Sequence, residues 1–195
     1  MNKRVLIEDK LIYFTNFYSE TQSRILFDKI LSESEWNQDE IIIFGKKVKI
    51  PRLSSWYADV GVSYKYSGLE LLPKTWSEVT KQIKAKIEEI TGYEFNSLLL
   101  NYYRDGKDSM GWHSDDEKEL GNNPIIASLT LGYPRRFLFR KKDSRTEKME
   151  ISLENGSLLM MVGDFQSIYE HSIPKTAKKI DARINLTFRK IIDNK

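Results

Sequence analysis

Two histidines and one aspartate are the residues of this sequence best suited to hold a metal ion. His113 and Asp115 lie two positions apart, and His171 is the only other histidine in the chain. In an extended strand this spacing puts both side chains on one face, so that they can reach the same ion. Two histidines and a carboxylate form the facial triad that leaves positions open on a non-haem Fe(II) for co-substrate and oxygen. A surface histidine beside a solvated acidic turn is the alternative interpretation.

Polar and apolar residues alternate through the segment 183–189. One face of a strand there would carry polar side chains: Arg183, Asn185, Thr187 and Arg189. The other face would carry apolar ones: Ile184, Leu186 and Phe188. The two arginines would be about 20 Å apart along the strand, so their side chains must converge to share a small ligand. A dicarboxylate gives each guanidinium its own carboxylate, whereas an edge strand with solvent-facing arginines is the competing interpretation.

Composition limits the kinds of protein and site. The 195 residues contain no cysteine, which excludes disulfides, zinc ribbons, Fe–S clusters and thiol nucleophiles. Hydrophobic residues make up 40% and aromatic residues 12%, enough to fill the core of one folded domain. The longest uninterrupted apolar run is 158–162, and the amino terminus lacks a signal-peptide core. We therefore expect a soluble cytoplasmic protein, nuclear if the source is eukaryotic, with no membrane partner.

Charge is more informative by segment than in total, because the formal net charge is only +3. Segment 44–52 carries a balance of +4, and segments 132–148 and 174–190 each carry +5, whereas 104–119 is rich in acids. Acid clustered between basic stretches would suit a cation-holding pocket within a phosphate-binding surface. Ordinary solvated surface charge is the alternative.

Helical patterns occupy part of the first half, and strand patterns dominate after Gly92. Ser19 with Gln22, and Thr75 with Glu78, have the spacing of capping boxes that begin two helices, the second ending at Gly92. Segment 41–50 has the pattern of a strand, a tight turn and a second strand. Beyond residue 92 the apolar period approaches two, which predicts strands at 96–104, 124–131, 136–141, 147–152, 158–162 and 182–190. This pattern predicts a β-sandwich or jelly roll.

Five ordered motifs resemble the AlkB family of Fe(II)/2-oxoglutarate dioxygenases. They are NYYRDG at 101–106, WHSDDE at 112–117, PIIAS at 124–128, HSIP at 171–174 and RINLTFR at 183–189. The resemblance covers about residues 40–192 and implies a mainly β fold with flanking helices (α+β) around a double-stranded β-helix, or jelly roll, core. We expect a single domain, 1–195, with the helices and a nucleotide-recognition hairpin in 1–92 and the catalytic core in 93–192.

The resemblance also implies the roles of the residues in the core. His113, Asp115 and His171 would bind Fe(II). Arg183 would bind the distal carboxylate of 2-oxoglutarate and Arg189 the carboxylate near the metal. Three further residues would assist them: Asn101, Tyr103 and Asn185. With O2 as the second co-substrate, such an enzyme hydroxylates an N-methyl group on a damaged base and releases formaldehyde and succinate.

Other matches to the family concern the damaged base, which must leave the stack to reach buried iron. The segment 64–68 resembles the lining of the base pocket, so Tyr66 is expected to stack on the flipped base, with Tyr64 and Ser67 beside it. Glu117 occupies the place of an acid that faces the base, where it would favour a cationic methylated base over a neutral one. Asp116 could instead orient an arginine.

The hairpin at 41–50 resembles the finger with which duplex-acting members probe DNA. Phe44 is expected to wedge into the base stack, and Arg52, with the nearby lysines, to contact phosphates or the opened strand. Trp112 and Tyr66 look more like members that prefer single strands. The sequence therefore favours a monomeric demethylase that repairs 1-methyladenine and 3-methylcytosine in DNA. Duplex DNA is the favoured substrate, and single-stranded DNA and RNA are its competitors. Two further functions compete with this one: a nucleic-acid-binding module without turnover, and a dioxygenase acting on proteins or small molecules.

Overall fold

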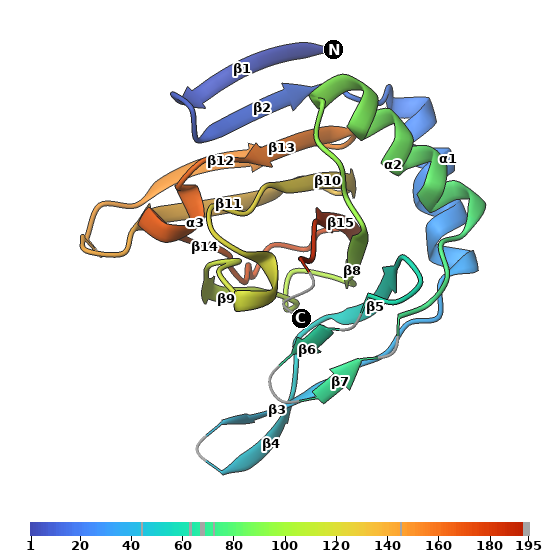
Figure 1. The fold of residues 1–195 in the computed structure, drawn as a ribbon. Coiled ribbons are helices and arrows are strands. Elements are labelled where there is room, and N and C mark those ends of the chain that lie inside the picture. The colour runs from blue at the N-terminus through green and yellow to red at the C-terminus, as the bar shows by residue number, and fades with distance from the viewer. Residues whose placement is uncertain (44, 63, 67–68, 72, 145, 193–195) are drawn as a thin grey trace.

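The large sheet of the protein has seven antiparallel strands and supplies most of the core. The computed structural model describes residues 1–43, 45–62, 64–66, 69–71, 73–144 and 146–192. The order across this sheet is β1-β2-β13-β10-β15-β8-β5 (Figure 1). The strands are β1 Asn2–Ile7, β2 Leu11–Thr15, β13 Ser157–Met161, β10 Ile126–Gly132, β15 Arg183–Arg189, β8 Ser97–Tyr103 and β5 Leu53–Ala58.

A second, four-stranded sheet packs against the first in the order β12-β11-β14-β9. Its strands are β12 Met149–Leu153, β11 Arg135–Lys141, β14 Tyr169–Ile173 and β9 Met110–His113. The two sheets form the jelly-roll core, which confirms the predicted mainly β class with flanking helices. All six strands predicted after residue 92 are present within a few residues of their predicted bounds. Five strands of these two sheets had no predicted counterpart: β1, β2, β5, β9 and β14.

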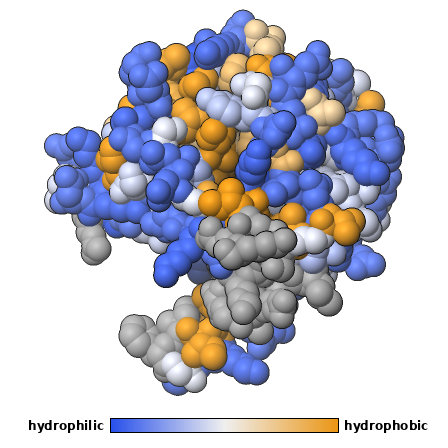
Figure 2. All heavy atoms as spheres, viewed as in Figure 1, coloured by the Kyte–Doolittle hydropathy of each residue, from blue (hydrophilic) through white to orange (hydrophobic). Residues whose placement is uncertain are grey.

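The predicted hairpin at 41–50 is present and extends away from the two sheets (Figure 1). It consists of β3 Glu40–Ile43 and β4 Lys46–Lys49, with Gly45 at a φ of 75° in the turn. Gly45 adopts this left-handed conformation without the steric cost that a β-carbon would bring. Figure 2 shows hydrophobic residues on this projection, where Ile42 is 74% exposed. A second small hairpin pairs β6 Tyr64–Tyr66 with β7 Leu69–Leu71.

Helices α1 (Glu20–Glu33) and α2 (Glu78–Thr91) lie over one face of the large sheet. The capping box of Ser19 and Gln22 is confirmed, as is the left-handed Gly92 at the end of α2. The second predicted box is wrong, because Ser77, and not Thr75, caps α2 by accepting a hydrogen bond from the Thr80 amide. Two short helices follow later in the chain: η1 (Lys118–Leu120) and α3 (Phe165–Ile168).

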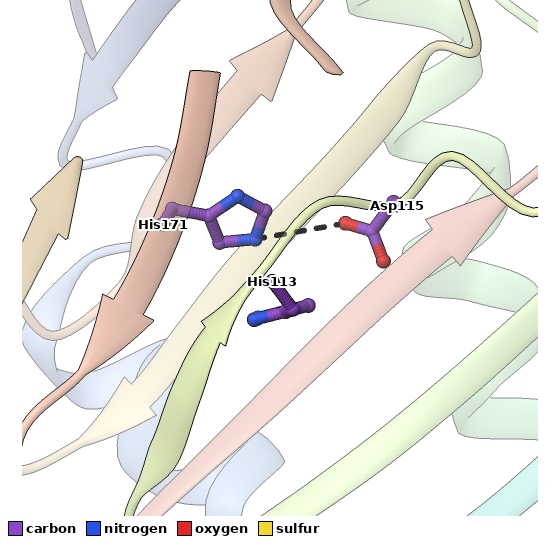
Figure 3. Close-up of side chains that lie close together, drawn as sticks. All are labelled: His113, Asp115 and His171. Carbon is purple, nitrogen blue, oxygen red and sulfur yellow. Dashed lines mark ion pairs between the residues drawn. The ribbon is translucent and has the colours of Figure 1, made fainter. Parts of the chain in front are cut away.

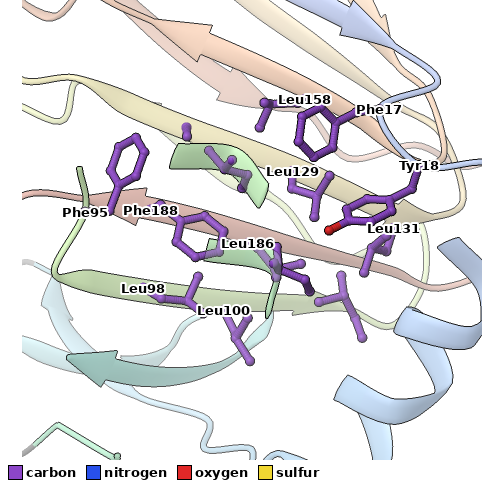
Figure 4. Packing of buried hydrophobic residues seen from close by; sticks show 14 of the residues in the cluster. Phe17, Tyr18, Phe95, Leu98, Leu100, Leu129, Leu131, Leu158, Leu186 and Phe188 are labelled. Atoms are coloured by element: carbon purple, nitrogen blue, oxygen red, sulfur yellow. The ribbon is translucent and has the colours of Figure 1, made fainter. Parts of the chain in front are cut away.

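Two clusters of buried apolar side chains cover the two faces of the large sheet. The first packs Ile83 and Ile87 of α2 against sheet residues such as Leu129, Leu186 and Phe188 (Figure 4). The second fills the space between the two sheets, and its members include Tyr103, Phe137, Phe139, Phe165 and Ile173. Burial of this apolar area is the main stabilising contribution to the fold. It also fixes the position of the polar side chains between the sheets.

Candidate metal and co-substrate site

His113, Asp115 and His171 lie close together, with the two histidines on β9 and β14 and Asp115 just after β9 (Figure 3). Their candidate ligand atoms are all within 4.8 Å of one another, and His171 Nε2 is 3.7 Å from Asp115 Oδ2. Strand pairing places the two histidines opposite each other on β14 and β9. The Nδ1 atom of His113 is 2.9 Å from the Gly111 carbonyl oxygen. A proton on Nδ1 would leave Nε2 as the ligand atom, the usual arrangement at metal sites.

The charges of this group suit a cation. Burial opposes ionisation of Asp115, but Arg189, His171 and His113 together outweigh it and hold the pKa of that carboxyl at about 2. Burial and the neighbouring His113 lower the pKa of His171 to about 3. The group therefore offers an ionised carboxylate and a neutral imidazole, the forms that bind metal ions. Two nitrogen donors and one carboxylate oxygen also fit Fe(II).

Beside the triad, a cavity of about 40 Å³ reaches into the space between the sheets. Its lining includes polar side chains from β8, β10 and β15: Asn101, Tyr103, Ser128, Asn185, Thr187 and Arg189. The predicted division of β15 into two faces is confirmed, since Ile184, Leu186 and Phe188 belong to the core cluster on the opposite side. The cavity thus has hydrogen-bonding side chains on a strand whose other face is apolar.

Arg183 is fully buried next to Tyr103, with its guanidinium carbon 5.1 Å from the centre of the phenol ring. One nitrogen, Nη2, donates to Thr130 Oγ1 at 2.9 Å, whereas Nε and Nη1 have no hydrogen-bond partner among the described residues. Burial lowers the pKa of Arg183 to about 10, so the side chain is charged at neutral pH. A buried cation with unbonded donors is costly, and a carboxylate is the ligand that best satisfies it. The residue therefore fits the distal carboxylate of 2-oxoglutarate.

Arg189 contacts the candidate metal ligand directly, because its Nη2 atom donates to Asp115 Oδ1. It also lines the small cavity and a larger one of about 200 Å³, both of which include His113 and Asp115 in their walls. Asn101 is shared by both cavities and accepts a hydrogen bond from Arg52 Nε at 2.8 Å. Two hydrogen bonds thus hold side chains that line both cavities: Arg189 to Asp115, and Arg52 to Asn101.

The larger cavity opens beside the triad and is lined mainly by β5, β8 and the segment after β9. Glu117 belongs to its wall, and the Oε2 atom of this side chain is buried without a partner in the described parts of the chain. Trp56, Leu99 and Met110 add apolar surface. A cavity with apolar walls and a few convergent polar groups is typical of a site for a small molecule. Because His113 and Asp115 line this cavity, a molecule bound in it would lie beside the candidate metal ligands.

Two polar residues differ from their predicted surroundings. Arg52 is only 5% exposed and is bonded to Asn101 in the wall of the larger cavity, unlike the exposed lysines of the hairpin, and its contact with phosphates or the opened strand stays a prediction. Asp116 pairs with Lys142 at 2.9 Å and not with an arginine. Both differences follow from β5 and β11, which bring Arg52 inward and place Lys142 beside the loop after β9.

Four residues predicted to meet the substrate are less fully described. Phe44 and Ser67 lie outside the described residues. Tyr64 and Tyr66 lie on β6, opposite Leu71 and Leu69 in the pairing of that hairpin, and only their backbone is described. Their roles therefore stay predictions.

Several residues of the larger cavity had no sequence prediction: Asn37, Asp39, Ser54, Ser55 and Lys74. Asn37 pairs with Ser54 as an isolated bridge beside β5, and Asp39 accepts a hydrogen bond from the Ser54 hydroxyl. Small polar residues next to a hairpin have the composition of an ordinary loop. The alternation of Asn37 with Asp39 was the only signal that both face one side.

Comparisons with known proteins agree with this geometry. Residues 10–189 match the family model of the 2OG-Fe(II) oxygenase superfamily. The chain is 37% identical over 192 residues to DNA oxidative demethylase ALKBH2 of Mus musculus, covering 93% of this chain and 80% of the relative. It is 37% identical to alpha-ketoglutarate-dependent dioxygenase alkB homolog 3 of Homo sapiens, covering 93% and 66%.

Two solved structures share the fold at low sequence identity. The structure of OsALKBH1 superposes with a TM-score of 0.70 at 13% identity, covering 97% of this chain and 100% of that one. A prolyl hydroxylase from Trichoplax adhaerens superposes with a TM-score of 0.64 at 10% identity, covering 94% and 84%. Within the described part of this chain, no helix is long and apolar enough to cross a membrane.

Proposed function

Because the chain belongs to the AlkB family within the 2OG-Fe(II) oxygenase superfamily, we propose that it oxidatively demethylates alkylated bases in DNA. The observation that carries this proposal is the triad of His113, Asp115 and His171 beside two cavities, the smaller of which is lined by Tyr103, the neighbour of the buried Arg183 with its unbonded donors. When bound, Fe(II) and 2-oxoglutarate supply the oxidation: with O2 they yield succinate and CO2 and hydroxylate the N-methyl group, which then leaves as formaldehyde.

The chain's own residues would bind and orient the reactants. His113, Asp115 and His171 would hold the iron. Arg183 would take the distal carboxylate of 2-oxoglutarate, with Asn101, Tyr103 and Asn185 lining the way to it. Arg189, already bonded to Asp115 Oδ1, would fix the metal-side end of the co-substrate and the carboxylate ligand together. Both reactants would then meet at one ion in a pocket largely closed to water.

The larger cavity would receive the flipped base. Methylation at N1 of adenine or N3 of cytosine makes the base cationic, and the unpartnered Oε2 of Glu117 offers it a buried negative charge. Tyr66, Tyr64 and Ser67 keep their proposed place beside the base. Recognition would then combine stacking with charge.

The β3–β4 hairpin supports duplex DNA as the substrate. Lys46, Lys47 and Lys49 are exposed on it, and Phe44, in its turn by sequence, keeps its proposed role as a wedge. Single-stranded DNA and RNA are the competing substrates. A monomer with a single domain suffices for this activity, and a DNA substrate would place it in the cytoplasm, or in the nucleus of a eukaryote.

The test measures the mass of an oligonucleotide with one 1-methyladenine, single-stranded and annealed, after incubation with the protein, Fe(II), 2-oxoglutarate and ascorbate. Loss of one methylene that requires 2-oxoglutarate is expected, faster for the duplex. Loss that is faster for the single strand would contradict the role of the hairpin. Succinate formation without loss of the methyl group in DNA or RNA would contradict demethylation while leaving the dioxygenase assignment intact.

The charge of Glu117 is tested with the same assay. Glu117→Gln removes the negative charge with little change of shape, so activity on 1-methyladenine should fall about tenfold. Activity on a neutral substrate such as 1-methylguanine should change little. An equal fall on both bases would show that Glu117 does not act through its charge.

A further inference from the structure

Asp115 lies just beyond the strand that carries the other ligand of its motif. Strand β9 ends at His113, so the Asp115 amide lies outside the described strands. The residue is nevertheless only 2% exposed. A buried amide without a partner costs free energy, and the orientation of a side chain in such a segment depends on whatever group bonds that amide.

The partner of this amide is Gln166, which lies on α3 and is fully buried. Its Oε1 accepts a hydrogen bond from the Asp115 amide at 3.0 Å, and its Nε2 lies 3.4 Å from Met161 Sδ. Both ends of the side-chain amide are thus used, and the requirement for an acceptor at Asp115 sets which end points there. Gln166 lines neither of the two cavities, so its contact with the site runs through the backbone of Asp115.

A second hydrogen bond joins the same two segments. Ser114 Oγ donates to the Tyr169 carbonyl oxygen at 2.9 Å. Tyr169 begins β14, the strand that carries His171, and its ring stacks on Phe165 of α3 at 4.9 Å between centroids. The loop that carries Asp115 is therefore held by two hydrogen bonds, from Ser114 and from the Asp115 amide, to the segment that leads into His171.

We infer that Gln166 is a positioning residue for the metal site: it fixes the backbone of Asp115 so that the carboxylate faces the two histidines before a divalent cation arrives. Groups that orient metal ligands in this way typically contribute 10- to 100-fold to affinity or activity. The inference rests on the proposed role of Asp115 as an iron ligand. Removal of the acceptor at Gln166 should then weaken cation binding without altering any group that touches the cation.

The experiment is an anaerobic titration of the full chain with Co(II), followed by its visible absorption. Gln166→Met keeps the length of the side chain and removes the acceptor, so the dissociation constant should rise 10- to 100-fold. Gln166→Glu keeps an acceptor of the same length and should recover most of this loss. Melting temperatures of all variants without metal are measured in parallel.

Ile87→Val is the control for stability, since Ile87 is fully buried on α2 in the other core cluster. It should lower the melting temperature and leave Co(II) affinity unchanged. If Gln166→Met binds Co(II) as tightly as the parent, or loses no more affinity than Ile87→Val at a similar melting temperature, the inference is wrong.

Asp115→Ala separates this inference from the assignment on which it rests. The parent chain should bind Co(II) and Asp115→Ala should bind it far more weakly. Equal binding by these two proteins would overturn the ligand assignment itself. Weak binding by Asp115→Ala together with parent-like binding by Gln166→Met would overturn only the role of Gln166.

Discussion

Charged side chains of the metal and co-substrate site are buried, whereas those of the β3–β4 hairpin are exposed. Asp115, Arg183 and Arg189 have 2%, 0% and 9% exposure, while the lysines from Lys46 to Lys49 are all exposed. Electrostatic interactions are strong where water is excluded and weak where water and salt screen them. Single residues should therefore dominate in the metal and co-substrate site, and only the sum of several should matter on the hairpin.

Replacement of Arg183 should have the largest effect and tests the buried side of this comparison. Arg183→Met removes two unbonded donors that fit a carboxylate, each such charge-assisted bond contributing about 1.5–3 kcal/mol, so KM for 2-oxoglutarate should rise about 100-fold or more. The ligand-free variant should unfold at an equal or higher temperature, because a buried charge with unsatisfied donors is lost. Succinate formation against 2-oxoglutarate concentration and thermal melts measure both. An unchanged KM would contradict the role of Arg183.

Neutralisation of the hairpin lysines should have a smaller, additive effect. Replacing Lys46, Lys47 and Lys49 with alanine should weaken binding of a methylated duplex and reduce the slope of log K against log salt by about 1 for every lysine that binds a phosphate. Fluorescence anisotropy between 50 and 200 mM NaCl measures it. The control is the same change of charge at the exposed Lys3, Lys29 and Lys81 on β1, α1 and α2. An equal loss of DNA affinity in the two triple variants would show that the hairpin is not part of the nucleic-acid-binding surface.

The smallest effect is expected at the ion pair of the buried Asp108 with the partly exposed Arg104, outside both cavities. Asp108 accepts hydrogen bonds from Arg104 Nε at 2.8 Å and Nη2 at 2.9 Å. Burial opposes its ionisation, but the bonds from Arg104 outweigh it and lower the pKa of Asp108 below its usual value. The ionised carboxylate therefore adds stability above the unfolded-state pKa of about 4, and that stability is lost as pH falls through the lower folded-state pKa.

Asp108→Asn should accordingly reduce the free energy of unfolding by about 1 kcal/mol at pH 7, the low end for a charged hydrogen bond because Arg104 is 42% exposed. The difference from the parent should shrink as pH falls below about 4. Urea unfolding at several pH values measures this difference in stability. Asp28→Asn, at an exposed position of α1, is the control. A difference that stays constant with pH would mean that the carboxylate acts only through its shape.

The sequence was most informative where polar residues alternate with apolar ones on a central strand. In β15 the apolar set packs beneath the sheet and the polar set lines the cavity, so both faces could be predicted from a period of two. The clustering of His113 and Asp115 was predicted from their spacing in an extended chain, although β9 ends at His113 and Asp115 lies just beyond it. The five motifs then implied the jelly-roll core through their resemblance to the AlkB family.

Prediction failed for several strands without a clear alternation of apolar and polar residues. In β5 the buried Ser54 and Ser55 replace apolar residues, and β14 buries His171 and Ser172, so neither strand has an apolar period. Strand β1 is exposed on most of its length and has no buried face to mark it. The role inferred for Gln166 was equally hidden, because its contact with Asp115 spans 51 residues of sequence. Polar side chains that line a site can thus obscure the apolar period of the strand that carries them, as in β5 and β14.

The position of β15 in the large sheet affects how the protein can be made. This strand lies between β10 and β8, yet it follows every other strand in the chain. During synthesis the edges of β8 and β10 that will pair with it stay open, and open edges invite pairing with other chains. A ribosome stalled before Arg183 would release a chain with two unjoined half-sheets and neither arginine. Closure of the sheet and completion of the co-substrate pocket are therefore one event. It can occur only after residue 189 has been translated.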